Sequence, residues 1–240
     1  MVLITGTARR VGAVIARALH GAGYDVALHY RHSRDELEAL IAELESARTD
    51  STLALQADLA DSGTLPALVE QVIARFGRLD ALVNNAAVFH PTPLGTLDAS
   101  ECDRLFAINA RAPLLLSQAA APHLKRSHGS IVNIVDIYAQ HPLRDYSAYC
   151  MSKAALATAT LALAQELAPE VRVNGVAPGN ILWPDQAANA EAHSRLLERT
   201  ALKRQGSPQD IAGAVLWLLR DAPFITGQIL RVDGGRGLAI

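Results

Sequence analysis

The fold is decided by Val2-Leu3-Ile4-Thr5-Gly6-Thr7-Ala8-Arg9-Arg10-Val11-Gly12, in which an apolar strand runs into a glycine turn and then into a helix. After the turn, apolar residues recur with helical spacing on one face, namely Val11, Val14, Ile15, Ala18 and Leu19. In such a unit the glycines let the backbone approach a pyrophosphate, and the helix N-terminus favours its negative charge. We therefore predict a dinucleotide site with contacts from Gly6, Arg9, Arg10 and Val11. The alternative is that the glycines serve only a tight connection.

Strands and helices alternate along the rest of the chain. Strands are predicted at residues 2–4, 25–30, 52–56, 81–83, 130–135, 172–177 and 228–232. Most are continuous apolar runs, as expected when helices cover both faces of a sheet. The sequence therefore predicts an α/β fold, a doubly wound parallel sheet of Rossmann type with about seven strands and right-handed crossovers.

Two helix starts carry capping signals. Ser33-x-x-Glu36 and Ser207-Pro208-x-Asp210 each place an acid at the third helical position after a serine. Residues 180–200 depart from the alternation, because they are polar and rich in alanine, and we expect them to leave the sheet and cover a site. No linker or repeat interrupts the chain, so residues 1–240 are interpreted as a single domain.

Composition excludes several classes of protein. Half of the 240 residues are apolar, and the formal net charge is −2, with no lysine or arginine run that would track nucleic acid. Cys102 and Cys150 form neither a disulfide framework nor a metal-ligand spacing, and the eight histidines predict no metal site. No apolar stretch approaches the roughly 20 residues that span a bilayer. With no room for a signal peptide before the first strand, the expected location is the cytoplasm.

The end of the second predicted strand indicates which dinucleotide binds. A fold that prefers NAD places an acid there, against the ribose hydroxyl. This strand ends in Tyr30-Arg31-His32-Ser33 and carries no acid. Guanidinium and hydroxyl groups bind a 2′-phosphate, whereas a carboxylate repels it. Arg31, His32 and Ser33 therefore favour NADPH, and the alternative is a solvated, basic helix start.

Two further strand ends carry candidate cofactor contacts. Asp58-Leu59 follows the third strand, and Asn85-Ala86 follows the fourth. Ligands of open α/β sheets bind outside the carboxyl ends of the strands. We expect Asp58 to meet an adenine amino group and the small Ala86 to allow close approach of the cofactor to the backbone.

Tyr149 and Lys153 lie four residues apart, and this spacing places a phenol and an ammonium on one face of a helix. A phenol with an ordinary pKa of about 10 is a poor acid–base catalyst at neutral pH. A neighbouring cation favours the phenolate and lowers that pKa. The pair follows an apolar strand in a nucleotide-binding chain, which favours catalysis over a chance surface pair.

With these residues the chain resembles the short-chain dehydrogenases/reductases over nearly its whole length. The matches are Thr5-Gly6, Gly12, Asp58-Leu59, Asn84-Asn85-Ala86, Asn109, Tyr149, Lys153, Pro178-Gly179 and Val232-Asp233-Gly234-Gly235. The resemblance implies that Tyr149 donates the proton, that Lys153 holds the nicotinamide ribose and lowers the tyrosine pKa, and that Asn109 supports a proton-relay water. It also implies a homotetramer or dimer built partly on the helix of Tyr149, and cofactor contacts from Pro178 and Gly179.

Asp136 departs from the family pattern. The family has a serine thirteen residues before the tyrosine, where its hydroxyl holds a substrate carbonyl. An ionised carboxylate only accepts hydrogen bonds and repels a developing oxyanion. It suits a substrate with N–H groups, or one that takes a proton on a ring nitrogen. Asp136 therefore favours reduction of a C=N bond, and the alternative is an aspartate that only caps a helix or turn.

Arg10 is the second departure, because it occupies a position where the family turn has glycine. Together with Asp136 and the segments 30–33 and 85–94, it resembles the pteridine reductase branch. That resemblance implies NADPH-dependent reduction of dihydropterins and, as a further possibility, of dihydrofolate. It implies that Phe89 stacks on the pterin, and that Arg10 reaches both the pyrophosphate and the pterin.

The stretch after Pro178-Gly179 lacks the threonine that often follows in the family. Ile181-Leu182-Trp183-Pro184 occupies that place, so backbone groups would have to hold the carboxamide. Trp183 is a candidate wall of the substrate pocket, whereas Trp217 lies in a segment interpreted as core.

Two alternatives to a pterin reductase remain open from the sequence. One is a carbonyl reductase of the same fold acting on a 3-oxoacyl, sugar or quinone compound, which Asp136 and Arg10 disfavour. The other is a regulator that binds NADP(H) without chemistry, which would have no need of Tyr149 and Lys153 together.

Overall fold

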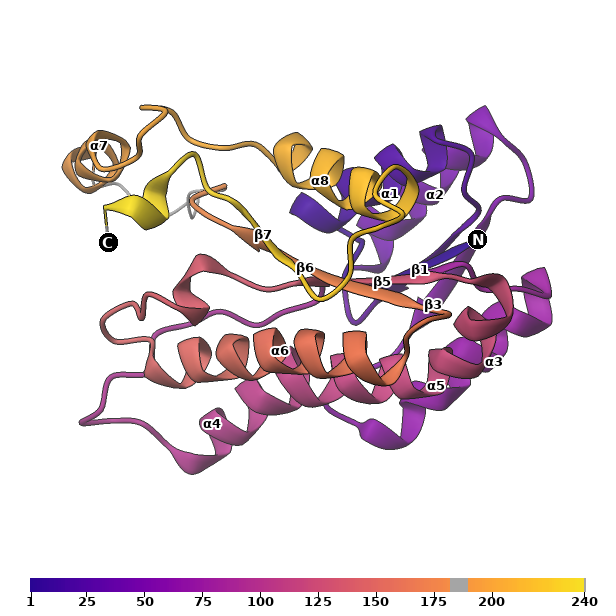
Figure 1. The fold of residues 1–240 in the computed structure, drawn as a ribbon, viewed down its shortest axis with the longest axis horizontal. Helices are drawn as coiled ribbons and strands as arrows, with labels where there is room; N and C mark the ends of the chain where they lie inside the picture. The colour runs from indigo at the N-terminus through magenta and orange to yellow at the C-terminus, as the bar shows by residue number, and fades with distance from the viewer. Residues whose placement is uncertain (182–189, 240) are drawn as a thin grey trace.

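Seven parallel strands form one sheet in the computed structural model, which describes residues 1–181 and 190–239 (Figure 1). The strands are β1 (Val2–Ile4), β2 (Val26–Tyr30), β3 (Thr52–Gln56), β4 (Ala81–Asn84), β5 (Ser130–Ile134), β6 (Arg172–Pro178) and β7 (Ile229–Val232). Their order is β3-β2-β1-β4-β5-β6-β7, and all neighbours are parallel. The predicted doubly wound fold is confirmed.

The strand order reverses beside β1, because β2 and β3 extend the sheet on one side and β4 extends it on the other. The connections from β1 to β2 and from β4 to β5 run in opposite directions along the sheet and leave their helices on opposite faces. Open α/β sheets bind ligands outside the carboxyl ends of the strands at such a reversal. The glycine turn after β1 lies at this place.

The connection from β6 to β7 runs in the same direction as that from β4 to β5, but its helix, Pro208–Arg220, packs on the face of the helix that follows β1. This crossover therefore has the opposite hand to the one from β4 to β5, and the expectation of right-handed crossovers throughout is wrong for it.

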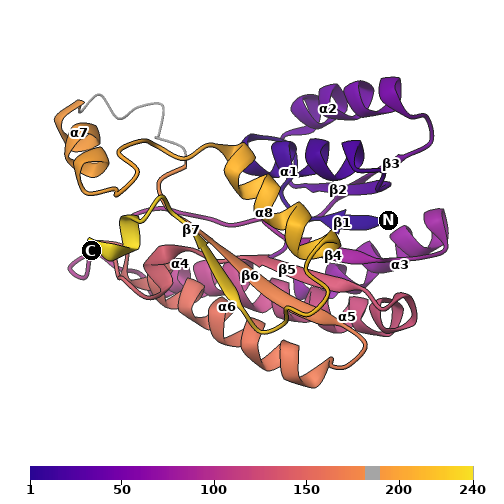
Figure 2. The ribbon, with the colours of Figure 1, turned by 45° about the horizontal axis from the view of Figure 1, so that its top comes forward.

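Helices cover both faces of the sheet (Figure 2). One layer holds α1, α2 and α8, and the other holds α3, α5 and α6. The helices are α1 (Arg10–Gly21), α2 (Arg34–Ala47), α3 (Leu65–Phe76), α4 (Ala99–Phe106), α5 (Ala112–Ser127), α6 (Ser147–Glu166), α7 (Ala190–Glu198) and α8 (Pro208–Arg220). Short 3₁₀ turns are η1 (Ser62–Thr64), η3 (Ile137–Ala139) and η4 (Arg236–Leu238), and η2 (Ala107–Arg111) is a π-helical turn between α4 and α5.

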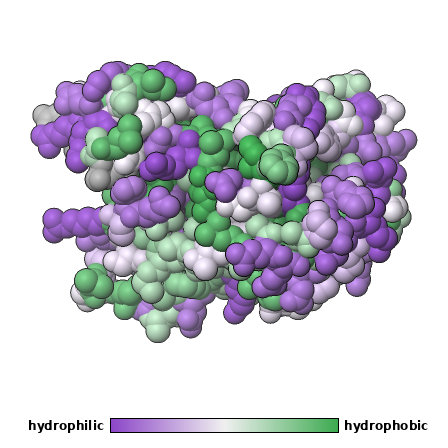
Figure 3. Space-filling model, viewed as in Figure 1, coloured by the Kyte–Doolittle hydropathy of each residue, from purple (hydrophilic) through white to green (hydrophobic). Residues whose placement is uncertain are grey.

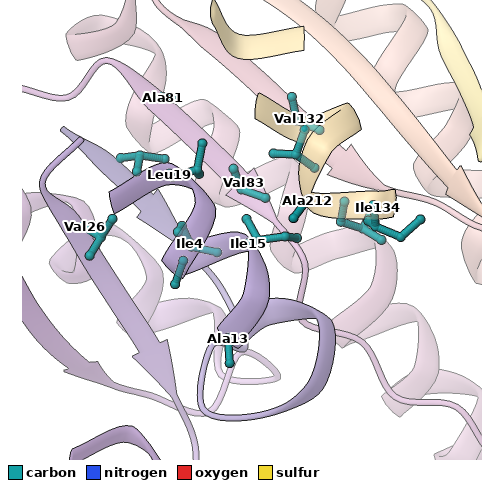
Figure 4. Close-up of a cluster of buried hydrophobic side chains, with 14 of the residues drawn as sticks. Ile4, Ala13, Ile15, Leu19, Val26, Ala81, Val83, Val132, Ile134 and Ala212 are labelled. Atoms are coloured by element: carbon teal, nitrogen blue, oxygen red, sulfur yellow. The ribbon is translucent and has the colours of Figure 1, made fainter. Parts of the chain in front are cut away.

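The two faces of the sheet have separate apolar cores. Val2 and Ile4 pack in the core beneath α1, whereas Leu3 between them packs in the core beneath α3. Figure 4 shows Ile4 beside Ile15 and Leu19 of α1. Fully burying one such side chain stabilises the fold by about 1.5–3 kcal/mol. Burial on both faces explains why these strands are continuous apolar runs.

Of the two predicted helix caps, only one forms as expected. Ser207 Oγ accepts from the Asp210 N–H at 3.2 Å, and the Asp210 carboxylate accepts from the Ser207 N–H at 2.7 Å. Ser33 also stands at an N-cap, of α2, but its side chain accepts no capping hydrogen bond in the described structure. Its ψ of 69° differs from the extended conformation from which a capping side chain reaches back to the helix.

Element boundaries differ from the expectations by one residue at several strand ends. β5 ends at Ile134, which leaves Asp136 at the start of η3. Of the predicted excursion 180–200, residues 182–189 lie outside the described residues, and α7 forms most of the remainder. None of the described helices combines the length and the hydropathy needed to cross a membrane.

Candidate active site

A cavity of about 550 Å³ opens at the carboxyl ends of the strands, where the strand order reverses. Its walls come from the glycine turn, the end of β2, and the segments after β3, β4, β5 and β6. The predicted site residues that line it are Gly6, Arg9, Arg10, Val11, Arg31, His32, Ser33, Asp58, Leu59, Asn85, Ala86, Phe89, Asp136, Tyr149, Lys153, Pro178 and Gly179. Asn109 lies outside the cavity wall, and Trp183 lies outside the described residues.

The glycine turn leaves no room for side chains at its two glycines. A Cβ on Gly12 would lie 2.0 Å from the Gly6 carbonyl oxygen, and one on Gly6 would lie 2.9 Å from Ala86 Cα. Gly6 also has a φ of +69°, which favours glycine. Arg10 has a φ of +54° without being glycine, and a non-glycine residue in this conformation is strained.

Hydrogen bonds join the glycine turn to the segment after β4. Thr5 Oγ1 accepts from the N–H groups of Asn85 at 2.9 Å and Ala86 at 3.0 Å. Asn85 Nδ2 donates to the carbonyl groups of Thr5 at 2.8 Å and Gly6 at 2.9 Å. The Asn85 side chain is therefore committed to holding the turn.

His29, which the sequence analysis did not single out, fastens the turn from β2. Its Nδ1 accepts from the Gly6 N–H at 3.1 Å, and its Nε2 lies 3.1 Å from the Ala57 carbonyl oxygen. A carbonyl only accepts, so the proton of neutral His29 is on Nε2. Burial lowers the pKa of His29 to about 4, although the Ala57 hydrogen bond and the Asp58 charge act in the opposite direction. The sequence feature that could have identified His29 as a site residue is a single histidine within the apolar run of β2.

Arg31 has an acidic neighbour that the local sequence does not show. Asp58, from the segment after β3, lies 3.7 Å from the Arg31 guanidinium, and Gln56 Nε2 donates to the Arg31 carbonyl at 3.0 Å. Both charged side chains are substantially exposed. An exposed pair of this kind contributes about 0–1 kcal/mol, so an anionic ligand can draw Arg31 away from Asp58.

Asp136 and Tyr149 are in direct contact. Tyr149 Oη donates to one carboxylate oxygen of Asp136 at 2.6 Å, and the Tyr138 N–H donates to the other at 2.9 Å. Burial raises the pKa of Asp136. Burial, followed by the Asp136 charge and hydrogen bond, raises the pKa of Tyr149 well above its usual value. The net direction for Tyr149 is therefore opposite to a lowering, because burial and the adjacent carboxylate favour the protonated phenol, and the effect of Lys153 on the tyrosine pKa stays a prediction.

Lys153 lies one helical turn beyond Tyr149 on α6 and is buried. Its Nζ donates to the Ile134 carbonyl at 2.8 Å. Burial lowers the pKa of Lys153 to about 8, although the Asp136 charge favours its protonated form. The ammonium group thus lies beside the cavity, and its buried environment makes it easier to deprotonate.

Asn109 joins the π-helical turn to the segment after β4 and to α6. Its Oδ1 accepts from the Val88 N–H at 2.9 Å, and its Nδ2 donates to the Val88 carbonyl and to Ser152 Oγ, both at 3.0 Å. Ser152 Oγ in turn donates to the Tyr149 carbonyl at 2.7 Å. The side-chain donors of Asn109 are thus used within the protein, and its role towards a relay water stays a prediction.

Three aromatic rings meet beside the cavity, and of these Phe89 and Tyr149 line it. Phe89 is 50% exposed and stacks on Tyr146 with ring centroids 4.6 Å apart. Its ring also meets Tyr149 edge-on, with centroids 4.7 Å apart. The sequence analysis missed Tyr146, although a tyrosine three residues before Tyr149 lies near the same helix face. A flat, exposed ring beside the phenol is suited to contact with a planar heterocycle.

Comparison with known proteins identifies the family. A family model described as enoyl-(acyl carrier protein) reductase matches residues 6–236. A solved structure of a doubly substituted short-chain dehydrogenase/reductase of Serratia marcescens is 35% identical, covers 98% of this chain and 97% of its own, and superposes with a TM-score of 0.92. The chain belongs to the short-chain dehydrogenase/reductase family. It is therefore an oxidoreductase of a family that uses a nicotinamide dinucleotide.

Two relatives within this family carry different names. Pteridine reductase 1 of Leishmania tarentolae is 36% identical over 98% of this chain and 96% of its own length. A 3-oxoacyl-[acyl-carrier-protein] reductase FabG of Staphylococcus aureus is 34% identical over 97% of this chain and 96% of its own length. The similar identities show the family without separating the two activities.

The residues of the cavity fit the dinucleotide that the family uses. Cβ atoms at Gly6 and Gly12 would clash with the protein itself, so the turn consists of bare backbone at these two positions. Helix α1 begins directly after it. Arg9, Arg10 and Arg31 supply positive charge along the same cavity. Among the described residues no group of three or more His, Cys, Asp or Glu could hold a metal ion.

Proposed function

We propose that this short-chain dehydrogenase/reductase is an NADPH-dependent reductase of a C=N bond in a dihydropterin, and that dihydrofolate is a further substrate. The observation that carries the proposal is the 2.6 Å hydrogen bond between Tyr149 Oη and Asp136. A carbonyl substrate gains from a hydroxyl donor at this position, whereas a carboxylate repels the oxyanion that forms. A pterin offers N–H groups that a carboxylate accepts.

The proton in this reaction comes from the Tyr149–Asp136 pair. Bound NADPH supplies the hydride that goes to carbon. The pair holds the phenolic proton in the hydrogen bond from Tyr149 Oη to Asp136, and it releases this proton to the substrate nitrogen. Because the two groups interact strongly, the proton belongs to the pair rather than to either residue. Lys153 holds the ribose of the nicotinamide side.

The preference for NADPH rests on Arg31, His32 and Ser33 at the end of β2. These residues line the cavity and offer a guanidinium, an imidazole and a hydroxyl to a 2′-phosphate. Asp58 is placed to accept from the adenine amino group once Arg31 turns to the phosphate. Gly6, Arg9 and Val11 receive the pyrophosphate, and Asn85, Ala86, Pro178 and Gly179 flank the cofactor.

The substrate lies against Phe89 in this proposal. The exposed ring exchanges its contact with Tyr146 for a contact with the pterin, and Arg10 reaches the same space from the glycine turn. Strain at a non-glycine residue persists where a side chain is needed, which supports a ligand role for Arg10. Trp183 is the candidate wall on the remaining side.

A carbonyl reductase is the second candidate, favoured by the Staphylococcus aureus relative with nearly the same identity. The test is NADPH consumption by the purified protein with dihydrobiopterin and dihydrofolate, compared with 3-oxoacyl, sugar and quinone substrates. Turnover of pterins above all ketones is the expected result. Turnover of a 3-oxoacyl compound with no pterin activity would replace the pterin assignment by the second candidate.

We further propose that the chain assembles as a homotetramer, with α6 and β7 at its interfaces. Met151 and Leu161 of α6 and Leu114 of α5 expose large apolar side chains. β7 is one of the two edges of the sheet, and apolar side chains gather over β6 and β7 in the middle of the face shown in Figure 3. Sedimentation equilibrium should give four times the chain mass, and a monomer would contradict the proposal.

A further inference from the structure

Phe89 lies in a segment that has no regular structure of its own. β4 ends at Asn84 and α4 begins at Ala99, and residues 85–98, all of which the structure describes, form no helix or strand between them. Without a ladder or a helix, the backbone groups of a segment must find their partners on side chains or in water. Contacts with neighbouring elements therefore decide where the Phe89 ring lies.

Both chain neighbours of Phe89 are held by other elements. On one side, Asn109 Oδ1 accepts from the Val88 N–H at 2.9 Å, and Asn109 Nδ2 donates to the Val88 carbonyl at 3.0 Å. On the other side, His90 Nε2 lies 2.9 Å from a carboxylate oxygen of Glu101. Asn109 belongs to η2 and Glu101 to α4, so two separate elements hold the chain on either side of the ring.

The contact between His90 and Glu101 is an ionic one. His90 Nε2 is buried and makes no aligned hydrogen bond within the described structure, although the carboxylate oxygen is close to it. Both side chains are partly exposed, and pairs of this kind have modest energies. Glu101 also lies in the first turn of α4, where an acid favours a helix without any partner. Glu101 can therefore serve the helix alone, or it can also hold His90.

We propose that His90 and Glu101 are positioning residues for the substrate, because they hold the Phe89 ring where it contacts a planar heterocycle. This inference rests on the proposed function, in which the pterin lies against that ring. Neither of these two described residues lines the cavity, so both act through Phe89. The Phe89 and Tyr149 ring centroids are 4.7 Å apart, and a displaced Phe89 ring would therefore displace the substrate relative to the phenol.

Removing the charge of Glu101 should weaken substrate binding without slowing the chemical step. Glu101→Gln should raise KM for dihydrobiopterin by about three- to five-fold, the size expected for a partly exposed ion pair. The kcat should stay within about two-fold of wild type, because the ring contacts the ground state and the transition state alike. His90→Gln removes the other partner, should have the same effect, and serves if the Glu101 variant does not fold. Asp35→Asn, which neutralises an exposed acid in the first turn of α2, is the control and should leave KM unchanged.

A double-mutant cycle separates a positioning role from a role in the helix alone. Phe89→Ala removes the ring and should itself raise KM for dihydrobiopterin. If Glu101 acts through the ring, adding Glu101→Gln to Phe89→Ala should raise KM no further, so the two effects are not additive. The measurements are initial rates at saturating NADPH with varied dihydrobiopterin. Calorimetric titration of dihydrobiopterin into the complex with NADP⁺ gives the same comparison without turnover.

Three results would overturn the positioning role. One is an unchanged KM in both Glu101→Gln and His90→Gln. The second is an equal rise of KM for Glu101→Gln with and without Phe89, because Glu101 then acts independently of the ring. The third is an equal effect of Asp35→Asn, which would indicate a general cost of losing an acid at a helix start. Failure of the proposed function has a different signature, in which wild-type protein oxidises no NADPH with a pterin. If a ketone is the substrate instead, the same cycle with that ketone tests the positioning role.

Discussion

At the residue scale, the role of Asp136 depends on the groups that its two carboxylate oxygens contact. One of its oxygens accepts from a backbone N–H as in an ordinary turn, and the other accepts from Tyr149. Asp136 can therefore cap the turn with one carboxylate oxygen and take part in catalysis with the other. The same contact raises the tyrosine pKa that an adjacent lysine alone would lower.

Asp136→Ser and Tyr149→Phe should each reduce pterin turnover by about 100-fold or more, because each removes a partner of the proton-donating pair. NADPH affinity should stay nearly unchanged, since the contacts proposed for the 2′-phosphate and pyrophosphate remain. Steady-state kinetics and NADPH fluorescence titration provide the two measurements. Turnover at the wild-type rate in either variant would remove that residue from the mechanism.

Arg31→Asp should lower the preference for NADPH over NADH by about 10- to 100-fold. The change removes a charge-assisted hydrogen bond of about 1.5–3 kcal/mol and places a carboxylate where the phosphate binds. The ratio of kcat/KM for the two cofactors measures the effect, with Arg34→Asp on the exposed start of α2 as the control. An unchanged ratio would contradict the phosphate assignment.

His29 should make stability depend on pH. Its folded pKa of about 4 lies below the unfolded value of about 6.5, so the unfolded chain binds more protons between them. The contribution of neutral His29 is complete above pH 6.5 and is lost as pH falls towards 4, by up to about 3 kcal/mol. Urea unfolding should show the difference between wild type and His29→Leu shrinking over this range. A constant difference, or equal shrinkage for His32→Leu, would speak against it.

At the scale of single elements, two similar N-cap motifs differ in whether the predicted side-chain hydrogen bonds form. Ser207 and Asp210 form both hydrogen bonds of a capping box at the start of α8. Ser33 has the same pattern, but its backbone turns from β2 towards the cavity, and the cap does not form. Local pattern predicted the helix start in both cases and the side-chain bond in one.

Ser207→Ala should therefore lower the free energy of unfolding of the cofactor-free protein by about 0.5–2 kcal/mol, the usual cost of losing an N-cap. Ser33→Ala is the matched control and should change it by less than about 0.5 kcal/mol, because no capping bond is lost. Equal losses in the two variants, measured by urea unfolding, would show that the Ser207 box is not a source of stability.

At the scale of the whole molecule, the cavity joins the two halves of the sheet. The glycine turn and the ends of β2 and β3 come from one half, and the ends of β4, β5 and β6 come from the other. A ligand that contacts both halves stabilises them together. Thr5 and Asn85 provide some of this connection within the protein itself.

NADPH at about 100 times its Kd should raise the free energy of unfolding by about 2.7 kcal/mol. Amide hydrogen exchange should slow at the glycine turn, at the end of β2 and in the segment after β4 together. NADH at the same concentration is the control and should protect less. Protection confined to one half of the sheet would mean that the cofactor does not bridge the two.

The sequence by itself determined the strands, their alternation with helices, the glycine turn and the candidate residues Tyr149, Lys153 and Asp136. Apolar runs and glycine spacing are local properties, and they follow from burial and backbone sterics. Only the tertiary structure decided the direction of the Tyr149 pKa, the pairing of Arg31 with Asp58, and the role of His29. Each of these depends on which distant groups meet in a place from which water is excluded, and the electrostatic effect of such contacts depends on distance and burial rather than on residue type.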